Sequence, residues 1–256
     1  MNKMMKLAGV LTLGLLFSGG LLAQNRAEPD SVETQCGALV IQPIVHGTVV
    51  VMHEDVVLYV DPYGGAASFV GLPKATHILI TDIHGDHLNA ETLEALDTEG
   101  VTFVVPAAVQ EKLPESLKGR TIVVLENGKK KKVDGVKIEA IPMYNLPETE
   151  DSGHPKGRGN GYVVTLCDQR IYFSGDTEDI AEMRALKKID IAFVCMNLPY
   201  TMDIHQAASA VLDFKPKVVY PYHYRGQEGL SDVEEFSEQV NEGGHTEVRL
   251  RSWYSE

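Results

Sequence analysis

The chain has 256 residues and a formal net charge of −13, and 44% of its residues are hydrophobic, which is enough for a substantial core. The acidic balance argues against nucleic acid or an anionic membrane as the main binding partner, because both require basic surfaces. A small-molecule substrate stays compatible with this composition.

The N-terminus has the pattern of an export signal. Lys3 and Lys6 precede an apolar run that ends near Leu22, and Ala23 stands at the expected cleavage point. This pattern is typical of a secretory signal peptide, although an uncleaved N-terminal anchor is the alternative. We expect a protein exported to the periplasm or secreted, with no membrane attachment after cleavage. The expected organisation is a signal peptide over 1–23, an extended leader over 24–37 and a single domain over 38–256.

The first half of the domain is predicted to be rich in strands. Short β-type runs occur at ALVIQPIV, TVVVMH, VVLYVDP, THILIT, VTFVVP and TIVVLENG. A turn is expected at Glu54-Asp55. Between the fourth and fifth runs, a helix is predicted that is capped by Asn89 and ended by Gly100.

The second half begins with hairpins and continues as strand–helix units. KKKKVDGVKIEAIP predicts a hairpin that turns at Asp134-Gly135, with its lysines on a solvated edge. GYVVTL and RIYFSGD predict a second hairpin. Helices are expected in DIAEMRALKK, DIHQAASAVLDF and SDVEEFSEQVNE, and strands in IDIAFV, KVVYPYH and TEVRLR. Because both halves have this organisation, we predict an α+β fold with two packed sheets and helices outside.

The three cysteines give no disulfide framework and no thiolate metal motif. Cys167 and Cys195 lie in strand-like runs, where we expect buried, small hydrophobic side chains. A disulfide that involves Cys36 remains open if the compartment is oxidising.

The densest group of ligand-type side chains lies in ILITDIHGDHLN, where Asp82, His84, Asp86 and His87 follow a β-type run. Imidazole and carboxylate together are ligands for zinc, iron or manganese. A polar turn ahead of the next helix is the simpler alternative. A metal centre also needs distant ligands, and suitable side chains occur at strand ends or in loops at His154, Asp176 and His223.

This ordered set resembles the metallo-β-lactamase superfamily, whose signature is H-x-H-x-D-H followed by a histidine, a bridging aspartate and a final histidine. IVHGTVVVMHEDVVLYVDP is similar to the start, and MNLPYTMDIHQAASAVLDFKPKVVYPYHY to the end, of its ascorbate-6-phosphate-lactonase-like and phospholipase-D-like branches. The resemblance implies an αββα four-layer sandwich, two divalent metal ions, and hydrolysis by a metal-bound hydroxide. Zinc is the first expectation for the metal, with manganese or iron as alternatives.

Carried over by position, the resemblance implies two metal sites. Site one comprises Asp82, His84 and His154, site two comprises Asp86, His87 and His223, and Asp176 bridges them. The chain departs from the family pattern in two places. Asp82 replaces the first histidine, which favours harder metals such as Mn²⁺. Asn145 occupies a position where the family often has a histidine, so His154 is the available substitute.

Further residues are candidates for catalysis and substrate binding. Asp86 is expected to orient the attacking hydroxide, and His46, Tyr224 and His205 are candidates, in that order, for the leaving-group acid. Basic side chains near the expected ligands could hold an anionic group of the substrate. These are Lys156, Arg158 and Arg225.

We therefore predict an exported metal-dependent hydrolase that acts on a small-molecule ester, lactone, amide or phosphodiester. A non-hydrolytic, diiron-type metal-binding protein of the same fold is the alternative from another class, and a β-lactamase is a third reading.

Overall fold

The computed structural model describes residues 26–254. The predicted signal peptide over 1–23 lies outside the described residues. None of the helices between residues 26 and 254 combines the length and the apolar character needed to cross a membrane.

The first sheet has seven strands, and neighbouring strands in the sheet follow chain order. It is antiparallel from β1 to β4 and parallel from β4 to β7. The strands are β1 (Asp30–Thr34), β2 (Gly37–Val45), β3 (Thr48–His53), β4 (Val56–Val60), β5 (His77–Leu79), β6 (Thr102–Val105) and β7 (Thr121–Val124). Strand β1 falls in the stretch 24–37 that we expected to be a leader, and it pairs with β2, so part of that stretch belongs to the sheet.

The second sheet also has seven strands, in the order β16-β13-β12-β11-β10-β9-β8. Its strands are β8 (Lys130–Val133), β9 (Val136–Met143), β10 (Gly159–Leu166), β11 (Gln169–Phe173), β12 (Ile191–Val194), β13 (Val218–Pro221) and β16 (Glu247–Val248). Both predicted hairpins are confirmed, β8–β9 and β10–β11. A separate two-stranded ribbon pairs β14 (Arg225–Gly226) with β15 (Gly229–Leu230).

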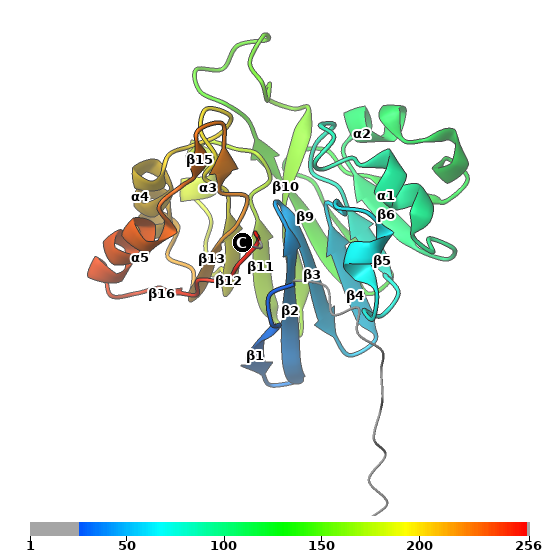
Figure 1. The fold of residues 1–256 in the computed structure, drawn as a ribbon, viewed down its shortest axis with the longest axis horizontal. Coiled ribbons are helices and arrows are strands. Elements are labelled where there is room, and N and C mark those ends of the chain that lie inside the picture. Colours follow the sequence, from blue (N-terminus) through cyan, green and yellow to red (C-terminus); the bar gives the residue numbers. More distant parts are fainter. Residues whose placement is uncertain (1–25, 255–256) are drawn as a thin grey trace, which may run out of the picture.

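Helices cover the outer faces of the two sheets (Figure 1). They are α1 (Ala90–Ala95), α2 (Ala107–Lys112), α3 (Ala181–Arg184), α4 (Ile204–Phe214) and α5 (Val233–Glu242), with 3-10 turns η1 (Ala66–Phe69) and η2 (Glu115–Leu117). Helix α1 is capped by Asn89 as predicted but ends five residues before Gly100, and α3 is a single turn. Helix α2 was not predicted. Helix α4 has a reciprocal capping box between Asp203 and Gln206, which satisfies its first amides.

Alternate residues of the first sheet belong to two different cores, because successive side chains of a strand point to opposite faces. Val49, Val51 and Leu58 pack in the cluster that includes the second sheet and α3–α5. Val50 and Tyr59 pack in a second cluster with residues of α1 and α2. The sheet is therefore buried on both faces, and the four layers are helix, sheet, sheet and helix.

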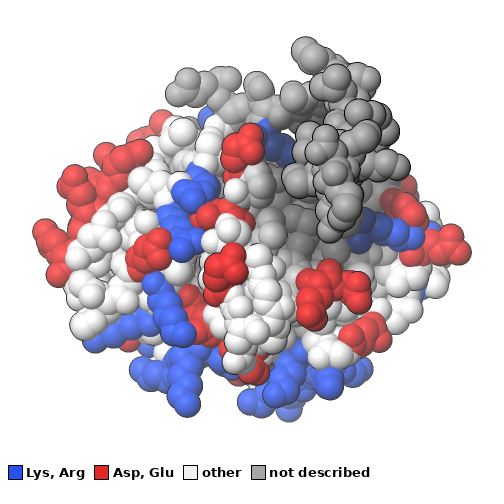
Figure 2. Space-filling model, turned by 90° about the horizontal axis from the view of Figure 1, so that it is seen from below, with Lys and Arg blue, Asp and Glu red and all other residues white. Residues whose placement is uncertain are grey.

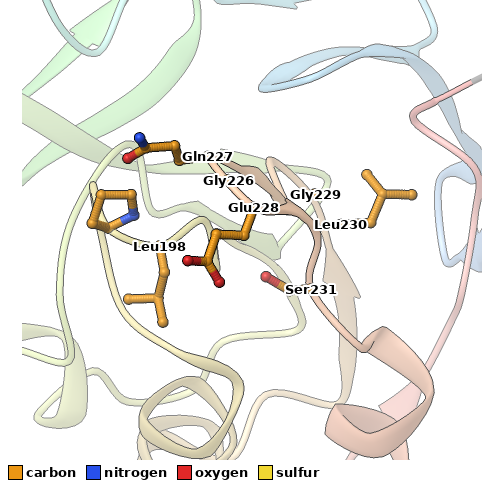
Figure 3. Close-up of a pocket in the computed structure, with 8 residues that line it drawn as sticks. Leu198, Gly226, Gln227, Glu228, Gly229, Leu230 and Ser231 are labelled. Carbon is orange, nitrogen blue, oxygen red and sulfur yellow. The ribbon is translucent and has the colours of Figure 1, made fainter.

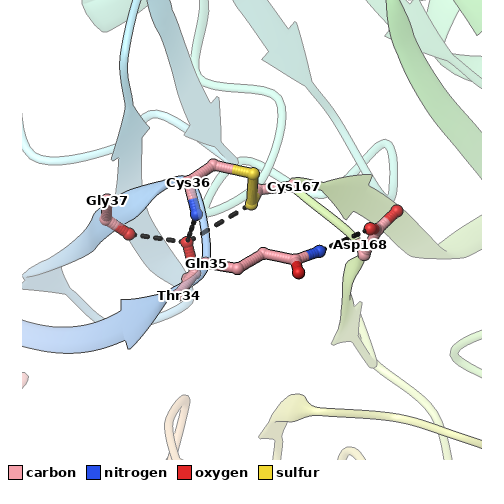
Figure 4. Close-up of a disulfide and its surroundings, with 6 residues drawn as sticks. All are labelled: Thr34, Gln35, Cys36, Gly37, Cys167 and Asp168. Carbon is pink, nitrogen blue, oxygen red and sulfur yellow. Dashed lines mark hydrogen bonds between the residues drawn. A yellow bond between two sulfur atoms is a disulfide. The ribbon is translucent and has the colours of Figure 1, made fainter.

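A disulfide joins Cys36 in the β1–β2 turn to Cys167 in the β10–β11 turn, across a sequence separation of 131 residues (Figure 4). Cys167 is therefore not the buried thiol that we expected, whereas Cys195 is free and buried. Cross-linking across a loop of this length stabilises a fold by about 2–5 kcal/mol, through the lost entropy of the unfolded chain. The bond ties the two sheets together.

The surface carries both signs of charge. Figure 2 shows lysine and arginine side chains interspersed with acidic side chains on the face seen from below. The lysines of β8 are exposed on the edge strand of the second sheet, as predicted. Charged side chains on an edge strand oppose its pairing with another chain.

Candidate metal centre

The predicted ligands collect where strands of both sheets end. Asp82 to His87 follow β5, Asp176 follows β11, and His223 follows β13. His154 comes from the β9–β10 loop, and His46 from the β2–β3 turn. Carboxyl ends of parallel strands meet at one edge of a sheet, which is why residues far apart in the chain converge here.

The local backbone at this end is constrained. His46, Asp61 and His223 have φ values of 56°, 45° and 49°, in the left-handed region that non-glycine residues rarely adopt. The His223 amide donates a hydrogen bond to the His46 carbonyl at 3.0 Å. A Cβ atom at Gly47 would lie 2.8 Å from Cδ2 of His223, so only glycine allows this approach. Such strain clusters at functional sites.

Site two and Asp176 bring their ligand atoms to a common point. Nε2 of His223 lies 3.3 Å from Nε2 of His87, from Oδ2 of Asp86 and from Oδ1 of Asp176. Nε2 of His87 lies 3.3 Å from Oδ2 of Asp176 and 3.8 Å from Oδ2 of Asp86. Ligands about 2.1 Å from a tetrahedral metal are about 3.4 Å from one another. His87, Asp176 and His223 therefore match the spacing of a coordination shell, and Asp86 lies beside them against His223.

A buried carboxylate fixes the orientation of His87. Nδ1 of His87 lies 2.8 Å from Oδ2 of Asp61, which also accepts hydrogen bonds from the Thr81 hydroxyl and, through Oδ1, from the Thr81 amide. Because a carboxylate can only accept, Nδ1 carries the ring proton and Nε2 keeps its lone pair for a metal. This carboxylate–histidine pairing is the usual outer support of a metal-ligating histidine.

Asn145 supports His154 in the same way. Its Oδ1 lies 3.1 Å from Nδ1 of His154 and accepts the His154 amide at 2.8 Å. Nε2 of His154 then points at Asp176, 3.3 Å from Oδ2. Both Nε2 of His154 and Oδ1 of Asp176 are buried without a hydrogen-bond partner in the structure. Buried polar atoms are rarely left unsatisfied, so these two fit a bound metal ion.

Site one has a different environment. Asp82 is fully buried, and Nδ1 of His84 lies 3.0 Å from its Oδ2, whereas Nε2 of His154 is 4.0 Å away. Arg158 donates from Nε to Oδ1 at 3.0 Å and from Nη2 to Oδ2 at 2.9 Å. Both oxygens of the carboxylate that replaces the family histidine are thus engaged by one guanidinium.

The electrostatics of the centre favour a cation. Burial disfavours the charged form of His87, yet Asp176 and Asp61 raise the pKa of this histidine well above its ordinary value. Burial likewise opposes ionisation of Asp176, but His223 and His87 lower the pKa of this carboxyl well below its usual range. The pKa of Asp86 is also lowered, by His223 and His46 against the effect of burial. Positive charge is thus stabilised beside these carboxylates, as a bound metal ion would be.

The donor set therefore fits a metal ion. Each of the groups Asp82–His84–His154 and His87–Asp176–His223 offers ligand atoms within 4.8 Å of one another, and so does His46–Asp86–His223. Imidazole nitrogens and carboxylate oxygens suit zinc, manganese or iron.

His46 is held by the C-terminal segment. Its Nε2 lies 3.1 Å from Oδ2 of Asp86, and its Nδ1 lies 2.6 Å from the hydroxyl of Tyr254. The carboxylate must accept, so Nε2 carries the proton and the Tyr254 hydroxyl donates to Nδ1. The Arg225 amide in turn donates to Tyr254 at 3.1 Å. Burial lowers the pKa of His46, which keeps the ring neutral despite the hydrogen bond to Asp86.

A cavity of about 580 Å³ opens over these groups. It is lined by His46, His84, Asp86, Asn145, Gly153, His154, Asp176, Asn197, Pro199, Tyr200 and Arg225. Arg225 is the one basic side chain of the described residues in this lining, and it lies over the Tyr254 ring at 4.5 Å. A second hollow adjoins through Pro199 and is lined by Leu198, Leu230 and the β14–β15 ribbon (Figure 3).

The other residues expected at the site lie elsewhere. Lys156 is outside the cavity lining and pairs with Glu148 at 3.0 Å and Glu182 at 3.2 Å. Tyr224 is buried, and its hydroxyl donates to the Arg251 carbonyl. His205 is exposed on α4, next to Gln239.

Three supporting residues were not assigned a role from the sequence. Asp61 had a signal, because an aspartate directly after a β-type run is placed at a strand end. Asn145 was identified only as a missing histidine. Tyr254 had no signal, since it lies 208 residues from its partner His46.

Comparisons with known proteins assign the chain to a family. The family described as "Beta-lactamase superfamily domain" matches residues 41–223. A metal-dependent hydrolase of the UPF0173 group from Thermococcus onnurineus is 33% identical over 174 residues, which cover 66% of this chain and 76% of that protein. A relative of the same description from Pyrococcus abyssi is 31% identical over 170 residues, covering 64% and 74%.

Solved structures give the same assignment. A candidate metal-dependent hydrolase from Parabacteroides distasonis superposes with a TM-score of 0.77 at 38% identity, covering 88% of this chain and 98% of that one. A metallo hydrolase from Ignicoccus hospitalis has the same fold, with a TM-score of 0.71 at 24% identity over 83% and 94% of the chains. The predicted αββα fold is confirmed. The chain belongs to the metallo-β-lactamase superfamily and is a metal-dependent hydrolase.

Proposed function

We propose that the protein is an exported hydrolase that cleaves an ester, lactone, amide or phosphodiester bond in a small molecule carrying an anionic group. The convergence of His87, Asp176 and His223 at coordination spacing, with Asp86 3.3 Å from His223, is the observation that carries this proposal. These four side chains would hold a divalent ion, and zinc is the first candidate. When bound, such an ion polarises the scissile carbonyl or phosphoryl group and lowers the pKa of a water molecule.

The chain's own residues would prepare the site for this chemistry. Asp61 and Asn145 keep the ligand nitrogens of His87 and His154 unprotonated toward the centre. His46 holds a proton at Nε2, directed at Asp86 and bordering the cavity. From that place a neutral imidazole is suited to deliver a proton to a leaving group.

Arg225 is positioned to select an anionic substrate. It is the basic side chain of the cavity lining, whereas Arg158 is bound to Asp82 and Lys156 to two glutamates. The adjoining hollow beside Leu198 and Leu230 offers apolar surface for the part of the substrate that does not react. A guanidinium over an aromatic ring is also oriented for a carboxylate or phosphate.

Export is supported by the N-terminal pattern and by the disulfide. The bond between Cys36 and Cys167 is of the kind that persists in oxidising compartments. Sequencing the N-terminus of protein from a periplasmic or secreted fraction tests this part. A mature chain beginning near Gln24 is expected, and a chain in the cytoplasm that keeps Met1 would contradict it.

The activity is tested with the metal-loaded protein and a panel of lactones, phosphodiesters, carboxyl esters and β-lactams. For a substrate that is turned over, Arg225→Gln should raise KM for the anionic form by about 10-fold, equal to about 1.4 kcal/mol, and leave a neutral analogue unchanged. Lys74→Gln, a change at a surface ion pair, is the matched control. If no member of the panel is hydrolysed faster than by the His223→Ala variant, the proposed bond classes are wrong.

A further inference from the structure

The replacement of a family histidine by Asp82 is accompanied by a cation on the same carboxylate. The Arg158 guanidinium forms two parallel hydrogen bonds to Asp82, at 3.0 and 2.9 Å. Its Nη2 also donates to the Gly153 carbonyl at 2.6 Å and lies 3.4 Å from Nε2 of His84. A planar fork with three acceptors is held in one orientation.

The backbone is built to keep this pair together. Gly159 follows Arg158 at the start of β10, and a Cβ atom there would lie 2.8 Å from the Thr81 carbonyl and 3.3 Å from Oδ1 of Asp82. The missing side chain lets β10 approach the β5 end closely. Arg158 is therefore delivered to Asp82 by the fold and not by a mobile surface loop.

The guanidinium competes with a metal ion in site one. A divalent ion bound by Asp82 would share one carboxylate with a fixed positive charge in a buried environment, where like charges repel strongly. The ligand atoms of Asp82 and His154 in site one are also farther apart than those around His223 in site two. Oδ2 of Asp82 is 4.0 Å from Nε2 of His154, whereas Nε2 of His223 is 3.3 Å from each of its three partner atoms.

We propose that Arg158 is the resident cation of site one, so that the protein holds one metal ion tightly, at site two, and a second ion only weakly. Here Asp82 acts as the partner of Arg158, and His84 and His154 remain available to a weakly bound second ion or to substrate. This inference rests on the proposed metal centre and changes its stoichiometry from two strong sites to one.

The experiment measures metal stoichiometry and affinity, independently of activity. Chelator-stripped mature protein is equilibrated with buffered Zn²⁺, and in parallel with Mn²⁺, and bound metal per chain is determined by elemental mass spectrometry. The wild-type protein should retain one ion, with the second bound about 100-fold more weakly or worse, because Arg158 already engages the Asp82 carboxylate. Two ions of equal affinity in the wild-type protein would overturn the proposal.

Variants of Arg158 test the cause. Arg158→Met removes the charge at similar length and should tighten the second ion by about 10–100-fold, whereas Arg158→Lys keeps the charge and should keep one ion. An unchanged second ion in a folded Arg158→Met protein would contradict the proposal.

A double variant keeps the test decisive if Arg158→Met fails to fold, since that single change leaves the Asp82 carboxylate buried without its partner. Asp82→His with Arg158→Gln removes both charges, installs an imidazole and should bind two ions. If this protein folds, as judged by circular dichroism, and still binds one, the proposal fails. His223→Ala distinguishes the assignment of the metal site from the proposed activity. Loss of the single tight ion in this variant confirms that the ion is bound at site two. Correct stoichiometry without hydrolysis would then refute only the proposed activity.

Discussion

Site one and site two are built from the same short segment but balance their charges differently. Asp86 and His87 face His223 and Asp176, and among the described residues the ion pairs of these two carboxylates are with histidines. Asp82, four residues earlier, faces the guanidinium of Arg158. A carboxylate in a ligand position thus need not imply a strong metal site, because its counter-charge can come from the protein.

The largest effect is expected from removing a ligand of site two. His223→Ala should abolish tight metal binding and lower kcat/KM on the order of 10³-fold, because a lost metal removes several kcal/mol of transition-state stabilisation. Metal analysis and steady-state kinetics measure both. His205→Ala, which changes an exposed histidine of α4, is the matched control and should behave like the wild-type protein. If the His223→Ala variant still bound one ion tightly, site two would not be the tight site.

The next effect concerns the outer support of site two. Asp61→Asn keeps the shape but removes the carboxylate that fixes the proton on Nδ1 of His87. Affinity for the tight ion should fall by about 10–100-fold, measured by competition with a chromophoric chelator. Unchanged affinity would show that the tautomer of His87 is set elsewhere.

The Asp82–Arg158 pair should reveal itself in the acid stability of metal-free protein. Burial raises the pKa of Asp82, but His84, His87 and Arg158 together lower it to about 2. Because the pKa is lower in the folded state, the stabilisation is present above the unfolded value near 3.9 and disappears as the pH falls through about 2.

Asp82→Asn should therefore lower the free energy of unfolding by about 2 kcal/mol at pH 6, and the deficit should shrink between pH 4 and pH 2. Urea unfolding of chelator-treated wild-type and variant proteins measures it. A deficit that stays constant over this range would mean that Asp82 is not held as a carboxylate by its neighbours.

The smallest effect is expected at Asn145, which orients the site-one ligand His154. Asn145→Ala should weaken the second ion by about 10-fold and leave the tight ion unchanged. Titration of the loaded protein with further metal separates the two. If Asn145→Ala lowered the affinity for the tight ion more than Asp61→Asn does, then Asn145, and not Asp61, would be the residue that supports site two.

Much of this architecture could be predicted from local sequence patterns. Strands such as Thr48–His53 are recognised by their β-branched residues, and the ligand positions follow strand ends in chain order. Strand β1 was missed because DSVET is largely polar and forms a strand only by pairing with β2. Helix α2 has six residues, too few for a periodic pattern.

The site was less predictable where it depends on tertiary contacts. The partner of Arg158 is 76 residues away, so the sequence could show a basic residue near a ligand but not that Asp82 would occupy it. Tyr254 reaches His46 from the far end of the chain. Electrostatic pairing of this kind is decided by the fold, after the strands have been placed.

The disulfide between the β1–β2 and β10–β11 turns also orders events during folding. It cannot close until residue 167 has left the ribosome, and by then the whole first sheet and its helices have been synthesised. Closure requires the Cα atoms of Cys36 and Cys167 to come within about 6 Å, which is the separation they have once the two halves of the sandwich are packed together. Trapping free thiols at intervals after synthesis would therefore follow how quickly this link between the two turns forms.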